Sequence, residues 1–142
     1  MVYGVGNPGR QDDGLGPAFV ERLEREKIEG VELEASHQFQ VEDALLFSEF
    51  PKLVVVDALK KGSGPFVFKK IRPARKFTFT THSLSAEAVL YLAKSLYGRC
   101  PEAYLLAIRG YEFEIGENLT PAAQKNLELA LSFFKEKVRP AF

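Results

Sequence analysis

Short apolar runs alternate along the chain with longer stretches in which apolar residues recur at helical spacing. This alternation is typical of a parallel β-sheet whose strands are joined by helices. The predicted strands are Val2–Val5, Val31–Ala35, Leu53–Val56, Phe66–Ile71, Lys76–Thr80 and Ala103–Ile108. The predicted helices are Pro17–Lys27, Val41–Glu49, a helix capped by Ser83 or Ser85 that runs to Tyr97, and one from Thr120–Pro121 to Val138.

The fold class follows from this order of elements. We expect an α/β protein in which residues 1–142 form a single three-layer domain, with a mostly parallel central sheet and helices on both faces. A chain of 142 residues is long enough for one well-buried core and too short for two.

Charge and composition exclude several classes of protein. Nineteen Lys and Arg residues balance nineteen Asp and Glu residues, so no cationic field is available for general binding of nucleic acid or an anionic membrane. Cys100 is the single cysteine, which excludes an internal disulfide and a cysteine-based zinc site. No window reaches eighteen apolar residues, so we expect no membrane span, and we expect a cytoplasmic monomer.

Polar residues follow most of the predicted strands. In an open parallel sheet, ligands bind in the crevice outside the carboxyl ends of the strands, so these residues should converge. The residues concerned are the Gly-rich loop 6–14, Ser36 and His37, Asp57, the tripeptide Thr81-His82-Ser83, and Arg109-Gly110.

Three of these positions carry the candidate chemistry. Asp57 directly follows a buried apolar run, where an ionised carboxylate is costly unless it caps a helix, pairs with a cation or binds a metal. Asp12 and Asp13 lie in the Gly-rich loop, where they either point at one cation or form a solvated turn with a capped helix. His82 lies among small hydroxyl residues that could orient its ring, although a lone histidine is usually structural.

Two carboxylates and one imidazole suit a borderline divalent ion such as Zn²⁺, Ni²⁺ or Mn²⁺. Three protein ligands would leave a coordination position open for water or for a substrate carbonyl.

A dinucleotide-binding fingerprint competes with this interpretation. Gly4 to Gly9 matches the G-x-G-x-x-G pattern after a strand, and Glu32 or Glu34 ends the next strand. However, Asp12 and Asp13 would stand where a pyrophosphate should approach the helix, and like charges repel. Nucleotide binding through the Gly4–Gly9 loop therefore remains the weaker alternative.

Several sequence blocks occur together in a characteristic order. They are Gly4-Val5-Gly6-Asn7-Pro8-x-Arg10-x-Asp12-Asp13-Gly14-x-Gly16, His37-Gln38-Phe39, Val54-Val55-Val56-Asp57-Ala58, Thr81-His82-Ser83, Tyr97-Gly98, Arg109-Gly110-x-x-Phe113 and Gly116-Glu117-x-Leu119-Thr120-Pro121. Over nearly the full length the chain resembles the hydrogenase maturation proteases, the endopeptidases that trim nickel–iron hydrogenase large subunits.

The resemblance implies a peptidase with specific site residues. Carried over by position, Asp13, Asp57 and His82 would be the metal-contacting and catalytic trio. The nickel would be supplied by the hydrogenase large-subunit precursor, and another divalent metal such as zinc could take its place. Cleavage would remove a short C-terminal peptide from that precursor. A nickel-site chaperone that binds the precursor without cleaving it is the further alternative.

We also expect substrate contacts at four other positions. These are Asn7, Asp12, His37 and Arg109. Asn7, or backbone N–H groups of the Gly-rich loop, could in addition stabilise the oxyanion formed at the scissile carbonyl.

Overall fold

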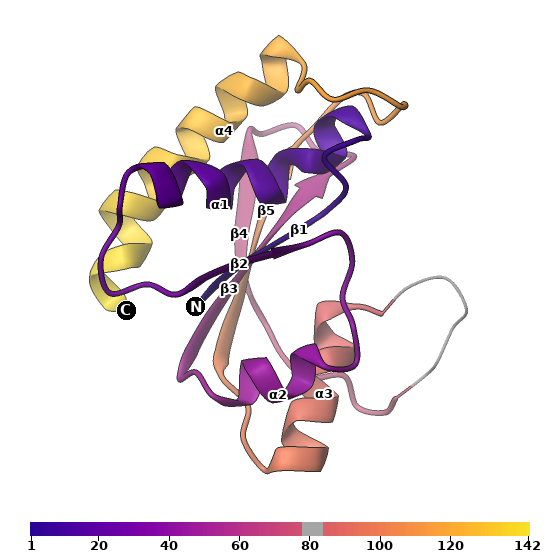
Figure 1. The fold of residues 1–142 in the computed structure, drawn as a ribbon, viewed down its shortest axis with the longest axis vertical. Helices are drawn as coiled ribbons and strands as arrows, with labels where there is room; N and C mark the ends of the chain where they lie inside the picture. Colours follow the sequence, from indigo (N-terminus) through magenta and orange to yellow (C-terminus); the bar gives the residue numbers. More distant parts are fainter. Residues whose placement is uncertain (78–83) are drawn as a thin grey trace.

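The computed structural model describes residues 1–77 and 84–142, and within them a single β-sheet forms the centre of the molecule (Figure 1). Its five described strands lie in the order β2-β1-β3-β5-β4. All neighbouring pairs are parallel except the edge strand β4, which is antiparallel to β5. The strands are β1 (Val2–Val5), β2 (Leu33–Ser36), β3 (Lys52–Leu59), β4 (Phe66–Ile71) and β5 (Glu102–Arg109).

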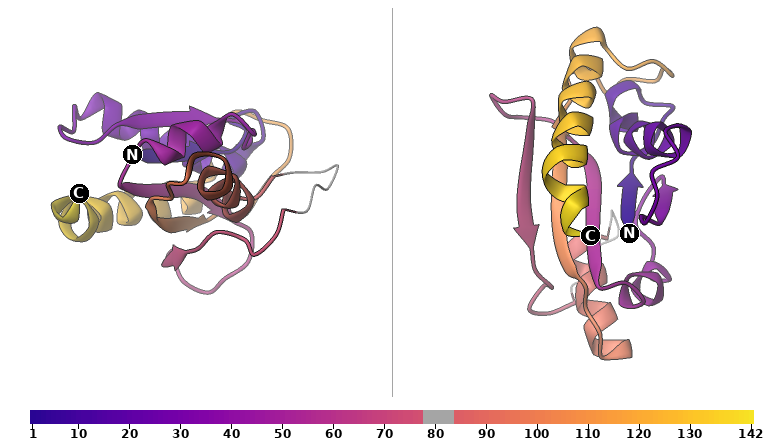
Figure 2. Two further views of the ribbon diagram at one scale, coloured as in Figure 1. Left: turned by 90° about the horizontal axis from the view of Figure 1, so that it is seen from below. Right: turned by 90° about the vertical axis from the view of Figure 1, so that its left-hand side faces the viewer.

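Helices cover both faces of the sheet, as the sequence predicts. Helices α1 (Leu15–Arg25) and α4 (Pro121–Phe133) lie on one face, and α2 (Asp43–Ser48) and α3 (Ala86–Tyr97) lie on the other (Figures 1 and 2). The three-layer α/β architecture with a mostly parallel sheet is therefore confirmed. None of the helices within the described ranges is long and apolar enough to cross a bilayer.

The alternation of side chains along β3 divides the interior into two cores. Val54 and Val56 pack on the side of α1 and α4, whereas Leu53 and Val55 pack on the side of α2 and α3. All four side chains are at most 1% exposed, and burial of each contributes about 1.5–3 kcal/mol. By the same alternation the next odd-numbered residue, Asp57, must point to the α2 and α3 face.

Both predicted helix starts with a capping side chain form, and of the two candidate caps for α3 the structure assigns Ser85. The Ser85 hydroxyl accepts a hydrogen bond from the Ala88 N–H at 3.1 Å, and the Thr120 hydroxyl accepts one from the Ala123 N–H at 3.2 Å. Pro121 follows at the first helical position, where the missing N–H costs nothing. Helix α1 begins two residues earlier than predicted, at Leu15, because a 3₁₀ turn over Gln11–Gly14 leads directly into it.

Some boundaries differ from the predictions. Asp57 lies inside β3, opposite Ala107 of β5, because the neighbouring strand continues to provide hydrogen-bond partners as far as Leu59. Lys76 and Phe77 are not part of a strand, and residues 78–80 of that predicted strand lie outside the described residues. The last helix changes to a π-helical turn over Phe134–Val138 and a 3₁₀ turn over Arg139–Ala141.

Candidate functional site

The Gly-rich loop after β1 is shaped by very close packing between backbones. A Cβ atom at Gly16 would lie only 2.4 Å from the Val56 carbonyl oxygen and 2.5 Å from the Val5 carbonyl oxygen, so α1 touches the sheet directly. Gly6 has a φ of +143°, and a Cβ there would lie 1.9 Å from the Asp13 carbonyl oxygen. Gly6 and Gly16 therefore let the chain pack on itself, so their presence is explained without a nucleotide.

The N–H groups of this loop are already engaged within the protein. Every residue from Gly6 to Asp13 that has a backbone N–H donates it to a protein oxygen, at distances of 2.7–3.1 Å. A phosphate cradle needs free N–H groups, so the geometry argues against the nucleotide-binding alternative. For the same reason these backbone groups are not available to an oxyanion, which corrects that expectation.

Asp12 is a fully buried carboxylate that joins the Gly-rich loop to the segment after β5. Its Oδ1 accepts a hydrogen bond from the Thr120 N–H at 2.8 Å. Its Oδ2 accepts from the Tyr111 N–H at 2.8 Å, the Glu112 N–H at 3.1 Å and the Thr120 hydroxyl at 2.8 Å. We refer to Asp12 with Tyr111, Glu112 and Thr120 as the Asp12 clasp.

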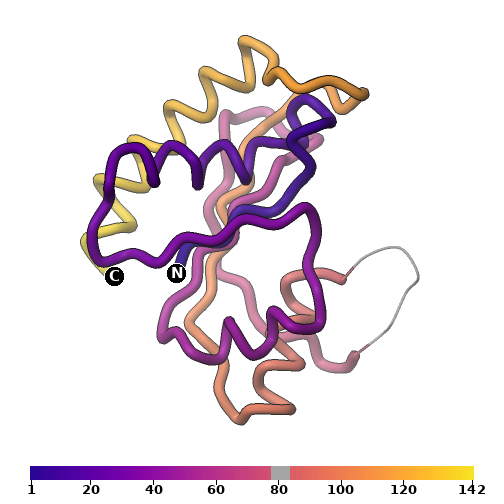
Figure 3. The backbone as a smooth tube through the Cα atoms, in the orientation of Figure 1, coloured from indigo at the N-terminus to yellow at the C-terminus, as the bar shows by residue number. Residues whose placement is uncertain are grey.

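The clasp holds the Gly-rich loop against residues 111–120, and these two segments lie side by side at the carboxyl end of the sheet (Figure 3). Burial alone would raise the pKa of Asp12, but the hydrogen bonds it accepts outweigh burial and hold that pKa below its ordinary value. The side chain is fully buried and its two oxygens accept four hydrogen bonds from the protein, so it is not accessible to a substrate. The expected substrate contact at Asp12 is therefore corrected to an internal structural one.

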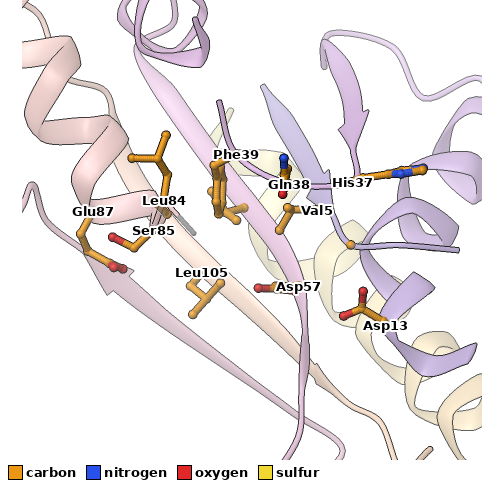
Figure 4. Close-up of a pocket in the computed structure, with 13 residues that line it drawn as sticks. Val5, Asp13, His37, Gln38, Phe39, Asp57, Leu84, Ser85, Glu87 and Leu105 are labelled. Atoms are coloured by element: carbon orange, nitrogen blue, oxygen red, sulfur yellow. The ribbon is translucent and has the colours of Figure 1, made fainter. Parts of the chain in front are cut away.

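A pocket of about 420 Å³ opens at the carboxyl end of β1 and β3, on the α2 and α3 face. Asp13 and Asp57 lie together on one side of it, and Ser85 and Glu87 of α3 lie on the opposite side (Figure 4). Phe39, from the segment after β2, forms part of the wall between them. The pocket thus joins a carboxylate of the loop after β1 with one of β3, as expected for a crevice in an open sheet.

Asp13 and Asp57 are held in the same manner. The Asn7 N–H donates to Oδ2 of Asp13 at 2.8 Å, and the Ala58 N–H donates to Oδ1 of Asp57 at 2.8 Å. No described residue donates a hydrogen bond to the other oxygen of either carboxylate. Each side chain is thereby oriented by its own loop or strand and keeps one oxygen for a ligand.

The environment of Asp57 makes its ionisation costly. Burial, and secondarily the negative charge of Asp13, raise the pKa of Asp57 to about 6, against the opposing effects of the Ala58 N–H and of Lys60. A carboxyl group whose pKa lies near neutrality can take up or release a proton under physiological conditions. A bound cation would favour the ionised form of Asp57.

The structure brings some of the other predicted residues to this pocket and not the rest. His37 lines it and is exposed, with its ring pointing away from Asp57 (Figure 4). Asn7 contributes its N–H to Asp13 and its Oδ1 to the Gly9 N–H, and it does not line the pocket. Arg109 lies over the Tyr111 ring at 4.4 Å and donates to the Gly62 carbonyl oxygen at 3.0 Å, also outside the pocket.

His82, the third member of the predicted trio, lies outside the described residues. Within residues 1–77 and 84–142, no group of three His, Cys, Asp or Glu side chains is arranged to hold a metal ion. Of the predicted trio, the described residues therefore include Asp13 and Asp57, which face one pocket.

Sequence reasoning missed the far wall of the pocket. Glu87 is half-buried in the first turn of α3, a few residues after the histidine-containing block, yet nothing in the helical pattern distinguishes it from a solvated residue. Leu84 and Leu105 line the pocket as well, and each reads in the sequence as an ordinary core residue.

Several solved structures with the same fold are hydrogenase maturation proteases. Neither protein-family profiles nor curated protein sequences match the chain. The structure is similar to the hydrogenase maturating endopeptidase HybD from Escherichia coli, with a TM-score of 0.75 and 23% identity over 99% of this chain and 91% of that one. It is also similar to the [NiFe] hydrogenase maturation protease HycI from Thermococcus kodakarensis, with a TM-score of 0.74 and 21% identity over 97% of this chain and 90% of that one.

A third solved structure extends the comparison to another archaeal source. The hydrogenase 2 maturation peptidase from a Thaumarchaeota archaeon has a TM-score of 0.68 and 20% identity, over 95% of this chain and 94% of that one. The chain thus has the fold of the hydrogenase maturation proteases along almost its whole length. The fold that the sequence resemblance implies is confirmed.

Proposed function

We propose that this protein is an endopeptidase that removes the C-terminal extension of a nickel-loaded nickel–iron hydrogenase large-subunit precursor. The observation that carries the proposal is the pair Asp13 and Asp57, oriented by backbone N–H groups and facing one pocket in this fold. The sequence blocks that resemble the maturation proteases supply both members of this pair.

Recognition of the substrate would begin with its metal. The nickel belongs to the precursor, and the free oxygens of Asp13 and Asp57 are suitable ligands for a divalent ion. His82 is proposed as the third ligand on the strength of the sequence block that contains it. Another divalent ion such as zinc would suit the same donors.

Cleavage requires an activated water at the scissile carbonyl. Binding of the precursor's metal between the two carboxylates would fix the cleavage segment in the pocket. Either that metal polarises the water, or Asp57 takes up its proton as a general base. In neither case would a nucleophilic side chain attack the scissile carbonyl.

The test is the intact mass of a nickel-loaded precursor after incubation with this protein, beside a nickel-free precursor. We expect loss of a C-terminal peptide with nickel only. Asp57→Asn should slow cleavage by about 100-fold or more, the lower range for removing a group that transfers protons in the reaction. Asp13→Asn removes a proposed ligand of the metal and should slow cleavage as well. The exposed residue Glu49, substituted to Gln, provides the control for loss of one acidic charge.

Each alternative has its own outcome in this experiment. Binding of the precursor without any change in mass would contradict the protease proposal and favour the nickel-site chaperone. Cleavage that persists unchanged in Asp13→Asn and Asp57→Asn would remove these residues from the mechanism. Saturable binding of NAD or ATP, without action on the precursor, would return the Gly4–Gly9 loop to consideration.

A further inference from the structure

A second hollow lies beside α3, away from the carboxylate pair. It is bounded by residues 72–75, which follow β4, and by residues 91–95 of α3, and its volume is about 720 Å³. The Ala74 N–H donates to the Glu87 carbonyl oxygen at 2.9 Å, so the segment after β4 is fixed against the helix that it passes (Figure 1). We call this hollow the basic groove.

The charges of the basic groove are all of one sign. Arg72, Arg75 and Lys94 line it, and none of its lining residues is acidic. Within the described part of the chain, none of these three side chains forms an ion pair or a hydrogen bond, whereas Arg22 and Lys135 each pair with glutamates. In a chain of zero net charge, this local excess should attract an anion.

The chemistry of the lining favours a carboxylate. A guanidinium group presents paired donors that match the two oxygens of a carboxylate, and two such groups face this groove. The partly buried Tyr91 lines the groove on the helix side, together with Lys94. The groove therefore fits a carboxylate-bearing chain segment better than an apolar one.

Position on α3 connects the basic groove with the carboxylate pocket. Glu87 lines the pocket, while Tyr91 and Lys94 line the groove, and spacings of four and three residues place them on one face of the helix. At 1.5 Å per residue, Glu87 and Lys94 are separated by about 10 Å along the helix axis. An extended peptide covers that distance in about three residues.

We propose that the basic groove binds a carboxylate of the segment that is removed, about three or more residues beyond the part held in the pocket. This inference rests on the proposed function. The removed segment is the part of the precursor that ends in a free carboxylate, so it can lie along α3 without a folded domain following it. The carboxylate belongs either to the chain terminus or to an Asp or Glu side chain of that segment.

The first test measures processing of the nickel-loaded precursor at low ionic strength. In the double variant Arg72→Gln/Arg75→Gln we expect KM to rise about 10-fold while kcat stays unchanged, because the groove binds and does not react. The control is Lys125→Gln/Lys137→Gln, which removes the same charge from exposed sites on the opposite face of the sheet. Equal KM values for the two variants would overturn the inference and leave the protease proposal standing.

The second test needs no processing and separates the two sources of the carboxylate. We would titrate the ¹⁵N-labelled protein with three acetylated Gly-Ser decapeptides: one with a free terminus, one with an amidated terminus, and one amidated with two internal Asp residues. Movement of the Arg72 and Arg75 Nε–H signals with the first peptide only assigns the terminal carboxylate. Movement with the third assigns side-chain carboxylates.

The outcomes of the two tests can be told apart. No movement with any decapeptide at millimolar concentration would contradict the carboxylate assignment, whatever the precursor shows. Movement of the arginine signals together with an uncleaved precursor would contradict the proposed protease and retain the groove as a carboxylate site.

Discussion

Asp12 and Asp13 are adjacent in the sequence, yet the two side chains lie in opposite environments. Asp12 is fully buried and accepts four hydrogen bonds, which hold its pKa below the ordinary value. Asp13 is partly exposed, accepts one backbone N–H and faces a pocket with Asp57. Asp12 therefore stabilises the contact between two segments, whereas Asp13 is available to a ligand.

Asp57 provides a third carboxylate environment to compare with those of Asp12 and Asp13. It is held by a single N–H, as Asp13 is, but burial and the nearby Asp13 raise its pKa to about 6. The ionised Asp12 stabilises the fold, because both of its oxygens accept hydrogen bonds. The ionised Asp57 destabilises the fold, because it is desolvated and only one of its oxygens accepts a hydrogen bond. Such a carboxylate is suited to binding a cation or a proton.

The largest effect should follow from breaking the Asp12 clasp. Asp12→Ala leaves the Thr120 and Tyr111 N–H groups without their acceptor, and we expect the free energy of unfolding to fall by about 4 kcal/mol at pH 7. Urea denaturation measures this, with Glu117→Ala, an exposed residue of the same segment, as control. A loss below about 1 kcal/mol would show that the clasp does not act as described.

Asp57→Asn should change stability in the opposite direction. The folded-state pKa of Asp57, about 6, lies above its ordinary 3.8, so the stability tied to its protonated form is present below pH 3.8 and lost as the pH rises through 6. The neutral asparagine avoids that loss and should raise the free energy of unfolding at pH 8 by up to about 3 kcal/mol.

The gain from Asp57→Asn should disappear near pH 4, where the wild-type carboxyl group is itself largely protonated. Thermal unfolding of both proteins at pH 4, 6 and 8 follows this trend. A variant less stable than wild type at pH 8 would instead make Asp57 a structural residue and remove the contrast with Asp12.

A smaller effect is expected at the residue that serves both the clasp and a helix. Thr120→Val removes the hydroxyl that donates to Asp12 and caps α4, at a cost of about 1–2 kcal/mol in the free energy of unfolding. Thr120→Ser keeps both hydrogen bonds and is the matched control. Because Thr120 does not line the pocket, processing below the unfolding transition should remain within about two-fold of wild type.

The sequence pattern predicted the fold well where local signals are strong. The apolar run at Leu53–Val56 and the caps at Ser85 and Thr120 each appear where expected. Boundaries were less predictable because they depend on neighbours: Asp57 is drawn into β3 by its pairing with β5. The candidate site was predictable in part, since Asp57 stood out as a carboxylate after a buried run.

By itself, the sequence determined the order of strands and helices and therefore which segments gather at the carboxyl edge of the sheet. The roles of Asp12 and Asp13 were decided only by the tertiary structure, because nothing local distinguishes two neighbouring aspartates in a glycine-rich loop. The donors to Asp12 come from residues 111–120, about a hundred positions away along the chain. They reach Asp12 because β5, which precedes them, lies beside β3 in the same sheet as β1. Asp12 points inward to those donors, and Asp13, the next residue along the chain, faces the pocket.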